Sequence, residues 1–153
     1  MFTEEEIKEI KDFISSSSLE SCIYIGTDSQ RKRKGKTRYA TVVIVHYDGN
    51  KGSKVFGTID VEKDVKEKLS RPFNRMMMET LKSCEAYELF AEAIGTRHCE
   101  VHLDVSQDKK CGSNVALQAA VGYVQGTIGL EPVTKPAGAS FAASCCADKF
   151  VRS

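Results

Sequence analysis

The feature that most constrains the fold is the stretch of residues 22–30, which reads Cys-Ile-Tyr-Ile-Gly-Thr-Asp-Ser-Gln. Its nearly continuous apolar run is typical of a strand that is buried on both faces, in the middle of a sheet. The run ends in a carboxylate, Asp28, which has little water to solvate it at such a position. A cation, a hydrogen-bond network or a metal ion must therefore compensate the charge of Asp28.

The size and composition of the chain indicate one globular domain over residues 1–153, with an apolar content of 41% and a charged content of 28%. No apolar run has the length of a membrane span, and the acidic start Met-Phe-Thr-Glu-Glu-Glu is unlike a signal peptide. We therefore expect no membrane partner, a cytoplasmic location and reduced cysteines. The formal net charge of +1 gives no overall attraction to nucleic acid.

The hydrophobic periodicity predicts a regular succession of helices and strands. A helix over 3–17 begins with a capping box formed by Thr3 and Glu6. Three strands follow, at about 22–28, 39–47 and 53–61, and the charged segment 62–71 is expected to begin the next helix. That helix runs over 71–94 and ends at Gly95. The remaining elements are a strand at 100–105, a helix at 114–125, a strand at 131–135 and a helix at 139–150.

This order predicts an α/β fold with a five-stranded mixed sheet. Three antiparallel strands followed by two strand–helix units give the strand order 3-2-1-4-5, with helices on both faces. The first and fourth strands are then parallel neighbours, so that Asp28 and Asp104 lie side by side at the strand ends. Two such carboxylates repel each other unless a cation lies between them.

Carboxylates that converge from separate elements are typical of a magnesium or manganese site. Pairs of these ions about 4 Å apart serve in phosphodiester cleavage, which requires about three or four acids. On the helix 71–94, Glu79 shares its face with small and apolar residues and is expected to point to the sheet, whereas Glu85 shares a charged face and is the reserve candidate. Asp148 follows a run of small residues that lets the last helix pack closely.

Several motifs that keep their order along the chain resemble the YkuK-like family of predicted nucleases related to ribonuclease H. They are Tyr-Ile-Gly-Thr-Asp-Ser-Gln (24–30), Glu-Val-His-Leu-Asp-Val-Ser (100–106), Ser-Asn (113–114), Gly-Tyr-Val-Gln-Gly (122–126), Lys-Pro (135–136) and Ala-Ser to Ala-Asp (143–148). The resemblance implies a ribonuclease H-like fold. Carried over by position, it implies catalytic and metal-binding roles for Asp28, Glu79, Asp104 and Asp148.

Each acid also has an ordinary structural interpretation. Asp28 alone would be a turn residue and Asp104 a strand-end cap, but together on neighbouring strands we interpret them as metal ligands. Glu79 is either a metal ligand or a glutamate on the helix surface. Asp148 is either a metal ligand or a partner in a salt bridge with a nearby cation. His102 alternates onto the face of Asp104, where it is either a proton shuttle or a core histidine. The spacing of the cysteines and histidines fits none of the usual zinc sites.

A basic segment and a helix start are the candidate substrate contacts. Residues 31–38 form an expected loop with six basic residues close to Asp28, suited to a nucleic-acid backbone. Ser113 and Asn114 would either hold a phosphate at a helix N-terminus, with Ser113 as the N-cap, or only cap it. The full set of expected contacts is Arg31, Lys32, Arg33, Lys34, Lys36, Ser113, Asn114 and Lys135.

The sequence therefore favours a nuclease that uses two Mg²⁺ or Mn²⁺ ions to hydrolyse phosphodiester bonds in nucleic acid. The alternative is a module of the same fold that binds nucleic acid or protein without catalysis. The sequence leaves open the form of the nucleic acid, whether RNA, DNA, hybrid or branched, and the oligomeric state.

Overall fold

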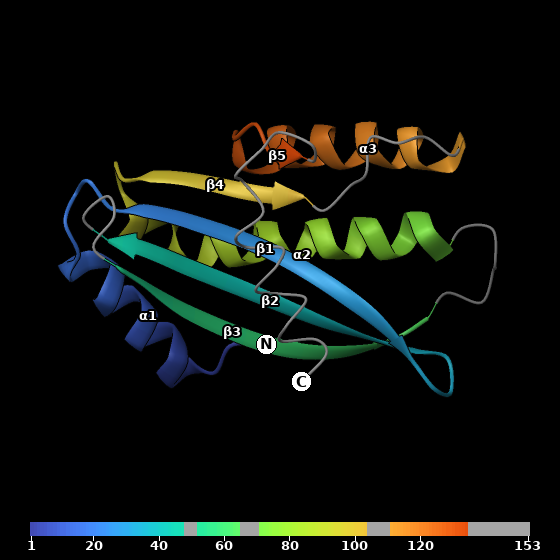
Figure 1. Cartoon of the computed structure of the whole chain (residues 1–153), viewed down its shortest axis with the longest axis horizontal. Helices are drawn as coiled ribbons and strands as arrows, with labels where there is room; N and C mark the ends of the chain where they lie inside the picture. The colour runs from blue at the N-terminus through green and yellow to red at the C-terminus, as the bar shows by residue number, and fades with distance from the viewer. Residues whose placement is uncertain (48–51, 65–70, 104–110, 135–153) are drawn as a thin grey trace.

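The computed structural model describes residues 1–47, 52–64, 71–103 and 111–134 (Figure 1). The helix expected at 139–150 lies outside these residues. The described elements are, in chain order, α1 (Glu4–Ser16), β1 (Cys22–Lys32), β2 (Lys36–Tyr47), β3 (Gly52–Lys63), α2 (Arg71–Ile94), β4 (His98–Leu103), α3 (Cys111–Ile128) and β5 (Val133–Thr134).

The strands form a five-stranded mixed sheet in the order β3-β2-β1-β4-β5, as predicted. β1 pairs antiparallel with β2 and parallel with β4, while β3 and β5 extend the sheet on either side. β1 is therefore the middle strand, as its apolar run indicated. In Figure 1, α2 passes behind this strand along most of its length.

The two faces of the sheet have different neighbours. Ile23 and Ile25 of β1 belong to the main core, together with residues of all three described helices, such as Ile14, Phe90 and Val124. We call this side the helix face. The side of the sheet that carries Tyr24, Gly26, Asp28 and Gln30 is called the Asp28 face, and it holds a smaller cluster around Val42 and Ile44. All three described helices contribute to the core on the helix face. The sequence predicted helices on both faces, and its last predicted helix, 139–150, lies outside the described residues.

The basic segment 31–38 is a hairpin and not the loop that the sequence predicted. Strand pairing continues to Lys32 opposite Lys36, and only residues 33–35 form the turn. Lys34 and Gly35 have φ angles of 64° and 66°, in the left-handed region that tight hairpin turns use. Residues 62 and 63, which were expected to begin a helix, extend β3 because Lys63 pairs with Lys36. Pairing across three strands thus outweighs the low strand propensity of the charged residues.

Local signals fix the ends of the first two helices. The capping box of Thr3 and Glu6 is present, with both reciprocal hydrogen bonds. α2 covers the predicted residues and ends at Gly95, whose φ of 56° suits a glycine. Among the described helices, none has the length and apolar character that crossing a membrane requires.

Candidate functional site

Asp28 is half-buried and lies within the middle strand, four residues before its end at Lys32. The prediction that this strand ends near Asp28 is therefore wrong, because pairing with β2 continues to Lys32. Its two neighbours in the chain both point to the helix face. The Thr27 hydroxyl lies 2.8 Å from that of Ser83 on α2, and the Ser29 hydroxyl bonds to Glu79 on the same helix. Because successive side chains of a strand point to opposite faces, Asp28 points away from α2.

Glu79 is bound to the helix face by a polar network. It accepts a hydrogen bond from the Ser29 hydroxyl, while the Arg75 guanidinium donates to the same hydroxyl at 2.9 and 3.1 Å and to the Ser29 carbonyl at 3.0 Å. Burial and the charge of Glu79 raise the pKa of nearby Tyr39 to about 12. The prediction that Glu79 points to the sheet is confirmed, but the structure does not bring Glu79 and Asp28 to the same face. Glu85 is exposed.

A row of polar side chains on β4 lies on the Asp28 face. His102 is opposite Gly26 in the register, and its ring lies 5.3 Å from that of Tyr24. Glu100 accepts from His98 at 2.7 Å and contacts His102 Nε2 at 3.0 Å. Burial lowers the pKa of His102 although Glu100 opposes the shift. Within the described part of the chain, His102 Nδ1 is buried without a hydrogen-bond partner.

The face that His102 occupies agrees with the sequence analysis, which did not consider its partner Glu100. The signal was present in the chain as the spacing His98, Glu100, His102, because alternate strand residues share a face. The two contacts to Glu100 lower the pKa of its carboxyl group, despite burial, which acts in the opposite direction. The row leads along β4 towards the end of the strand at Leu103.

Several predicted site residues cannot be placed. Asp104, Asp148 and Lys135 lie outside the described residues. The backbone of α3 begins at Cys111, three residues before the predicted start, so Ser113 and Asn114 are inside the first turn and Ser113 is not the N-cap. Within 1–47, 52–64, 71–103 and 111–134, no group of three or more histidine, cysteine and acidic side chains could hold a metal ion.

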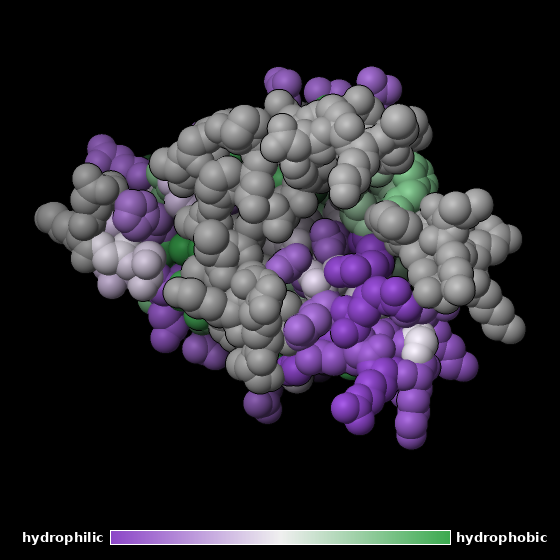
Figure 2. Space-filling model, turned by 45° about the vertical axis from the view of Figure 1, so that its right-hand side comes forward, coloured by the Kyte–Doolittle hydropathy of each residue, from purple (hydrophilic) through white to green (hydrophobic). Residues whose placement is uncertain are grey.

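The basic residues of the β1–β2 hairpin divide between the two faces. Arg31 is on the helix face, where its Nε lies 3.2 Å from Asp64 Oδ2. Lys32 has the opposite orientation and donates to Gln30 at 2.9 Å. Arg33 and Lys34 are exposed in the turn. Figure 2 shows hydrophilic side chains gathered at the end of the molecule where the hairpin projects.

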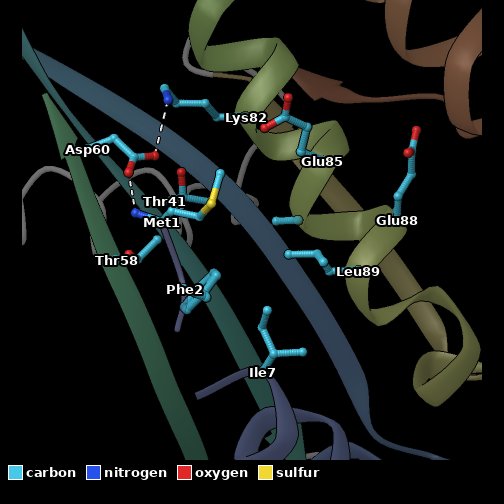
Figure 3. Close-up of a pocket in the computed structure, with 11 residues that line it drawn as sticks. Met1, Phe2, Ile7, Thr41, Thr58, Asp60, Lys82, Glu85, Glu88 and Leu89 are labelled. Atoms are coloured by element: carbon cyan, nitrogen blue, oxygen red, sulfur yellow. Dashed lines mark hydrogen bonds and ion pairs between the residues drawn. The ribbon is translucent and has the colours of Figure 1, made fainter. Parts of the chain in front are cut away.

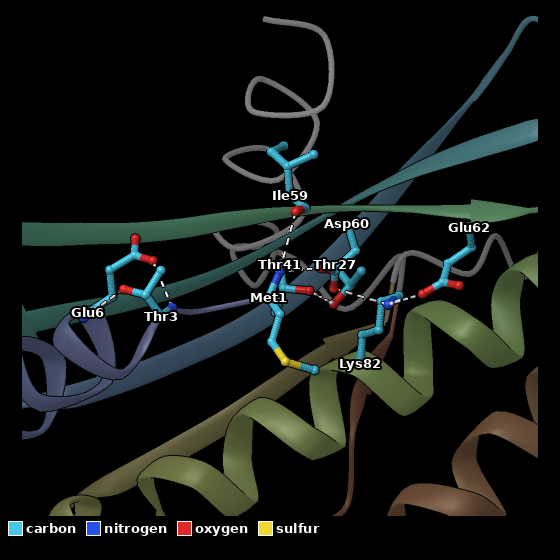
Figure 4. Close-up of polar contacts among 9 residues, drawn as sticks. All are labelled: Met1, Thr3, Glu6, Thr27, Thr41, Ile59, Asp60, Glu62 and Lys82. Atoms are coloured by element: carbon cyan, nitrogen blue, oxygen red, sulfur yellow. Dashed lines mark hydrogen bonds and ion pairs between the residues drawn. The ribbon is translucent and has the colours of Figure 1, made fainter.

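A cavity of about 430 Å³ lies on the helix face, between α1, α2 and the strands. Its wall combines apolar side chains, such as Phe2 and Leu89, with the pair of Lys82 and Asp60 (Figure 3). Lys82 Nζ is 3.1 Å from Asp60 and 3.2 Å from Glu62, and its side chain is only 9% exposed (Figure 4). These charges compensate one another, and the sheet separates them from Asp28.

Comparison with known proteins agrees with the architecture. A family described as Ribonuclease H-like matches residues 5–152, and the chain belongs to this family. A structural search found a weak likeness to a solved structure, "Crystal structure of NurA", at 15% identity and a TM-score of 0.31. The likeness covers 67% of this chain, which spans 26% of that one. A search of curated proteins found no match.

Proposed function

We propose that the protein is a metal-dependent nuclease that hydrolyses phosphodiester bonds in nucleic acid, in keeping with its resemblance to YkuK-like proteins. The observation that carries the proposal is the position of Asp28. A half-buried carboxylate lies in the middle strand of a Ribonuclease H-like sheet, two residues beyond the last described pairing of that strand with β4, on the face that the described helices do not cover. A half-buried carboxylate at this position suits an ion that prefers oxygen ligands, such as Mg²⁺ or Mn²⁺.

The proposed metal ligands are Asp28, Asp104 and Asp148. The register pairs Gly26 with His102, and the residues two positions further along the two segments are Asp28 and Asp104. Carboxylates in this number suit Mg²⁺ or Mn²⁺, and two such ions would stabilise the negative charge that develops on the phosphate oxygens. His102 lies on the same face, but its ring is buried and contacts Glu100, as in a core histidine.

We assign Glu79 a positioning role in place of metal ligation. Its contact with the Ser29 hydroxyl, which Arg75 also contacts, fixes the residue directly after Asp28. The network therefore holds the end of β1 against α2 from the helix face. The sequence predicted the same role for Glu79 and Asp28, whereas this assignment gives them different roles. Variants of the two residues should therefore behave differently.

A thermal shift experiment with Mg²⁺ or Mn²⁺ tests the site. An ion at one hundred times its dissociation constant adds about 2.7 kcal/mol to the free energy of unfolding, or roughly 5–11 °C in melting temperature. Asp28→Asn should lose this gain. Glu79→Gln should keep it and have a lower melting temperature without metal, and Glu85→Gln is the exposed control. An equal metal-induced rise in wild type and Asp28→Asn would contradict the proposed site.

Cleavage is tested with a panel of RNA, DNA, hybrid and branched substrates in Mn²⁺. The wild type should cut at least one of them, and Asp28→Asn should bind the same substrate without cutting it. If the wild type cuts none and both proteins bind equally, the protein is a binding module of the same fold. The Glu79→Gln variant should retain part of the wild-type rate, because it disturbs the position of β1 and not the ligands.

A further inference from the structure

Three lysines form a row across the end of the sheet. In the strand register, Lys32 of β1 is opposite Lys36 of β2, and Lys36 is in turn opposite Lys63 of β3. All three are exposed. The sequence alone does not indicate this row, because Lys63 is at the far end of β3 and most of β2 and β3 separates it in the chain from Lys32 and Lys36.

The three lysines share the Asp28 face. Arg31 and Thr37, which are opposite each other, both contact the carboxylate of Asp64 on the helix face. Lys32 and Lys36 are the next residues outward on the two strands, so they point to the other side. Lys63 is opposite Lys36 and has the same orientation.

The charges at this end of the sheet are segregated by face. Glu62 is opposite Thr37, and both it and Asp64 therefore belong to the helix face, where they contact Lys82 and Arg31. On the Asp28 face, none of the three lysines forms an ion pair with another described residue. Like charges directly opposite one another destabilise a sheet, so such a row suggests binding of a polyanion.

We infer that this row, Lys32, Lys36 and Lys63, binds the sugar–phosphate backbone of the nucleic acid. The inference rests on the proposed function for its choice of polyanion. Adjacent strands are about 4.8 Å apart, so the row is about 10 Å long, which is comparable to the axial rise of about three base pairs of a duplex.

The position of the row also gives the direction of the bound strand. Lys32 follows Asp28 by four residues on the same face, which is about 13 Å along β1, or about the axial rise of four base pairs of a duplex. Arg38 lies on this face between the two, opposite Gln30. The substrate thus extends from Asp28 along β1 and β2 to the row at the hairpin. Arg31 does not take part, because it faces α2.

The test is binding of fluorescein-labelled single-stranded and duplex DNA, followed by anisotropy between 50 and 300 mM salt in EDTA. Lys32→Gln, Lys36→Gln and Lys63→Gln should each weaken binding several-fold at low salt. Each should also reduce the slope of log affinity against log salt by about 0.7 on single strands and 0.9 on duplex. The row binds the form of nucleic acid, single-stranded or duplex, for which these variants lose more affinity.

Two controls remove the same charge from the helix face. Arg31→Gln is adjacent to Lys32 in the chain, and Lys54→Gln lies at the other end of β3, where the ammonium is 5.7 Å from the Phe56 ring centroid. Both should keep the wild-type salt slope. The melting temperature of each lysine variant should equal or exceed that of the wild type, because a repulsion is removed. Equal slopes for the row and control variants would overturn the inference.

The outcomes separate this inference from the proposed nuclease activity. If the row variants lose affinity and the wild type shows no metal-dependent cleavage, the lysine row binds nucleic acid and the proposed nuclease activity is refuted. If cleavage depends on Asp28 and the row variants keep the wild-type salt slope, the proposed nuclease activity is supported and binding of nucleic acid by the row is refuted. Binding is measured in EDTA, so neither result depends on the other.

Discussion

Three buried hydroxyl groups next to Asp28 form a hydrogen-bonded chain whose contribution to the free energy of unfolding can be predicted. The Thr27 hydroxyl lies 3.1 Å from that of Thr41 on β2 and 2.8 Å from that of Ser83 on α2. All three residues are at most 4% exposed, and the Thr27–Thr41 contact is drawn in Figure 4. The chain connects two strands and a helix, so replacing Thr27 by the similarly shaped valine isolates the contribution of its hydroxyl.

The magnitude follows from the two hydrogen bonds. Thr27→Val loses both, at about 1 kcal/mol each, and leaves two buried hydroxyl groups that need new partners. Ser83 can donate to the carbonyl four residues earlier in α2, which offsets part of that penalty. We expect a loss of about 2 kcal/mol in the free energy of unfolding, or roughly 4–8 °C in melting temperature. Ser83→Ala, which leaves the Thr27–Thr41 contact intact, should lose about 1 kcal/mol.

Urea denaturation of the two single variants and the double variant measures the coupling. The double variant should lose about 1 kcal/mol less than the sum, because the Thr27–Ser83 bond is counted in both single changes. Thr58→Val is the control, since this side chain on the same face makes no hydrogen bond within the described residues. Additive losses, within about 0.5 kcal/mol, would refute the proposed hydroxyl chain.

Three further predictions concern the helix face and the core. Lys82→Met should lose about 1–3 kcal/mol at pH 7, because it removes the contacts of Lys82 with Asp60 and Glu62 and leaves Asp60 only the N-terminal ammonium. Burial opposes ionisation of Asp60, but its contacts with the N-terminal ammonium and Lys82 lower its pKa below 3.8, so this difference should shrink in urea denaturation as pH falls below 3.8. Phe90→Ala should lose about 3–5 kcal/mol in the same assay, and a loss under 1 kcal/mol would contradict its place in the core. Burial raises the pKa of the Cys84 and Cys99 thiols to about 11 and 12, so iodoacetamide at pH 8 should modify both, as read by mass spectrometry, only in urea.

The candidate site was predictable in part. The sequence correctly put Asp28 on the middle strand, although that strand continues to Lys32 and does not end near Asp28. It also put His102 on the face opposite to Val101 and Leu103, because successive strand residues alternate. Asp104 and Asp148 stay predictions, since they lie outside the described residues. Glu79 was correctly assigned to the sheet side of α2. The partner of Glu79, however, is Ser29, because α2 covers the opposite face of β1.

The sequence by itself determined the succession of the described elements, the strand order and the ends of the first two helices, because periodicity, caps and connection lengths are local properties of the chain. Only the tertiary structure decided which face of the sheet α2 covers, since helical periodicity carries no information about the face that a helix will meet. The register of β3 on β2 was decided in the same way. The pairing of β1 with β2 converts the basic segment into a hairpin, and the register of β3 on β2 places Lys63 beside it, because side chains distant in the chain become neighbours only when strands pair.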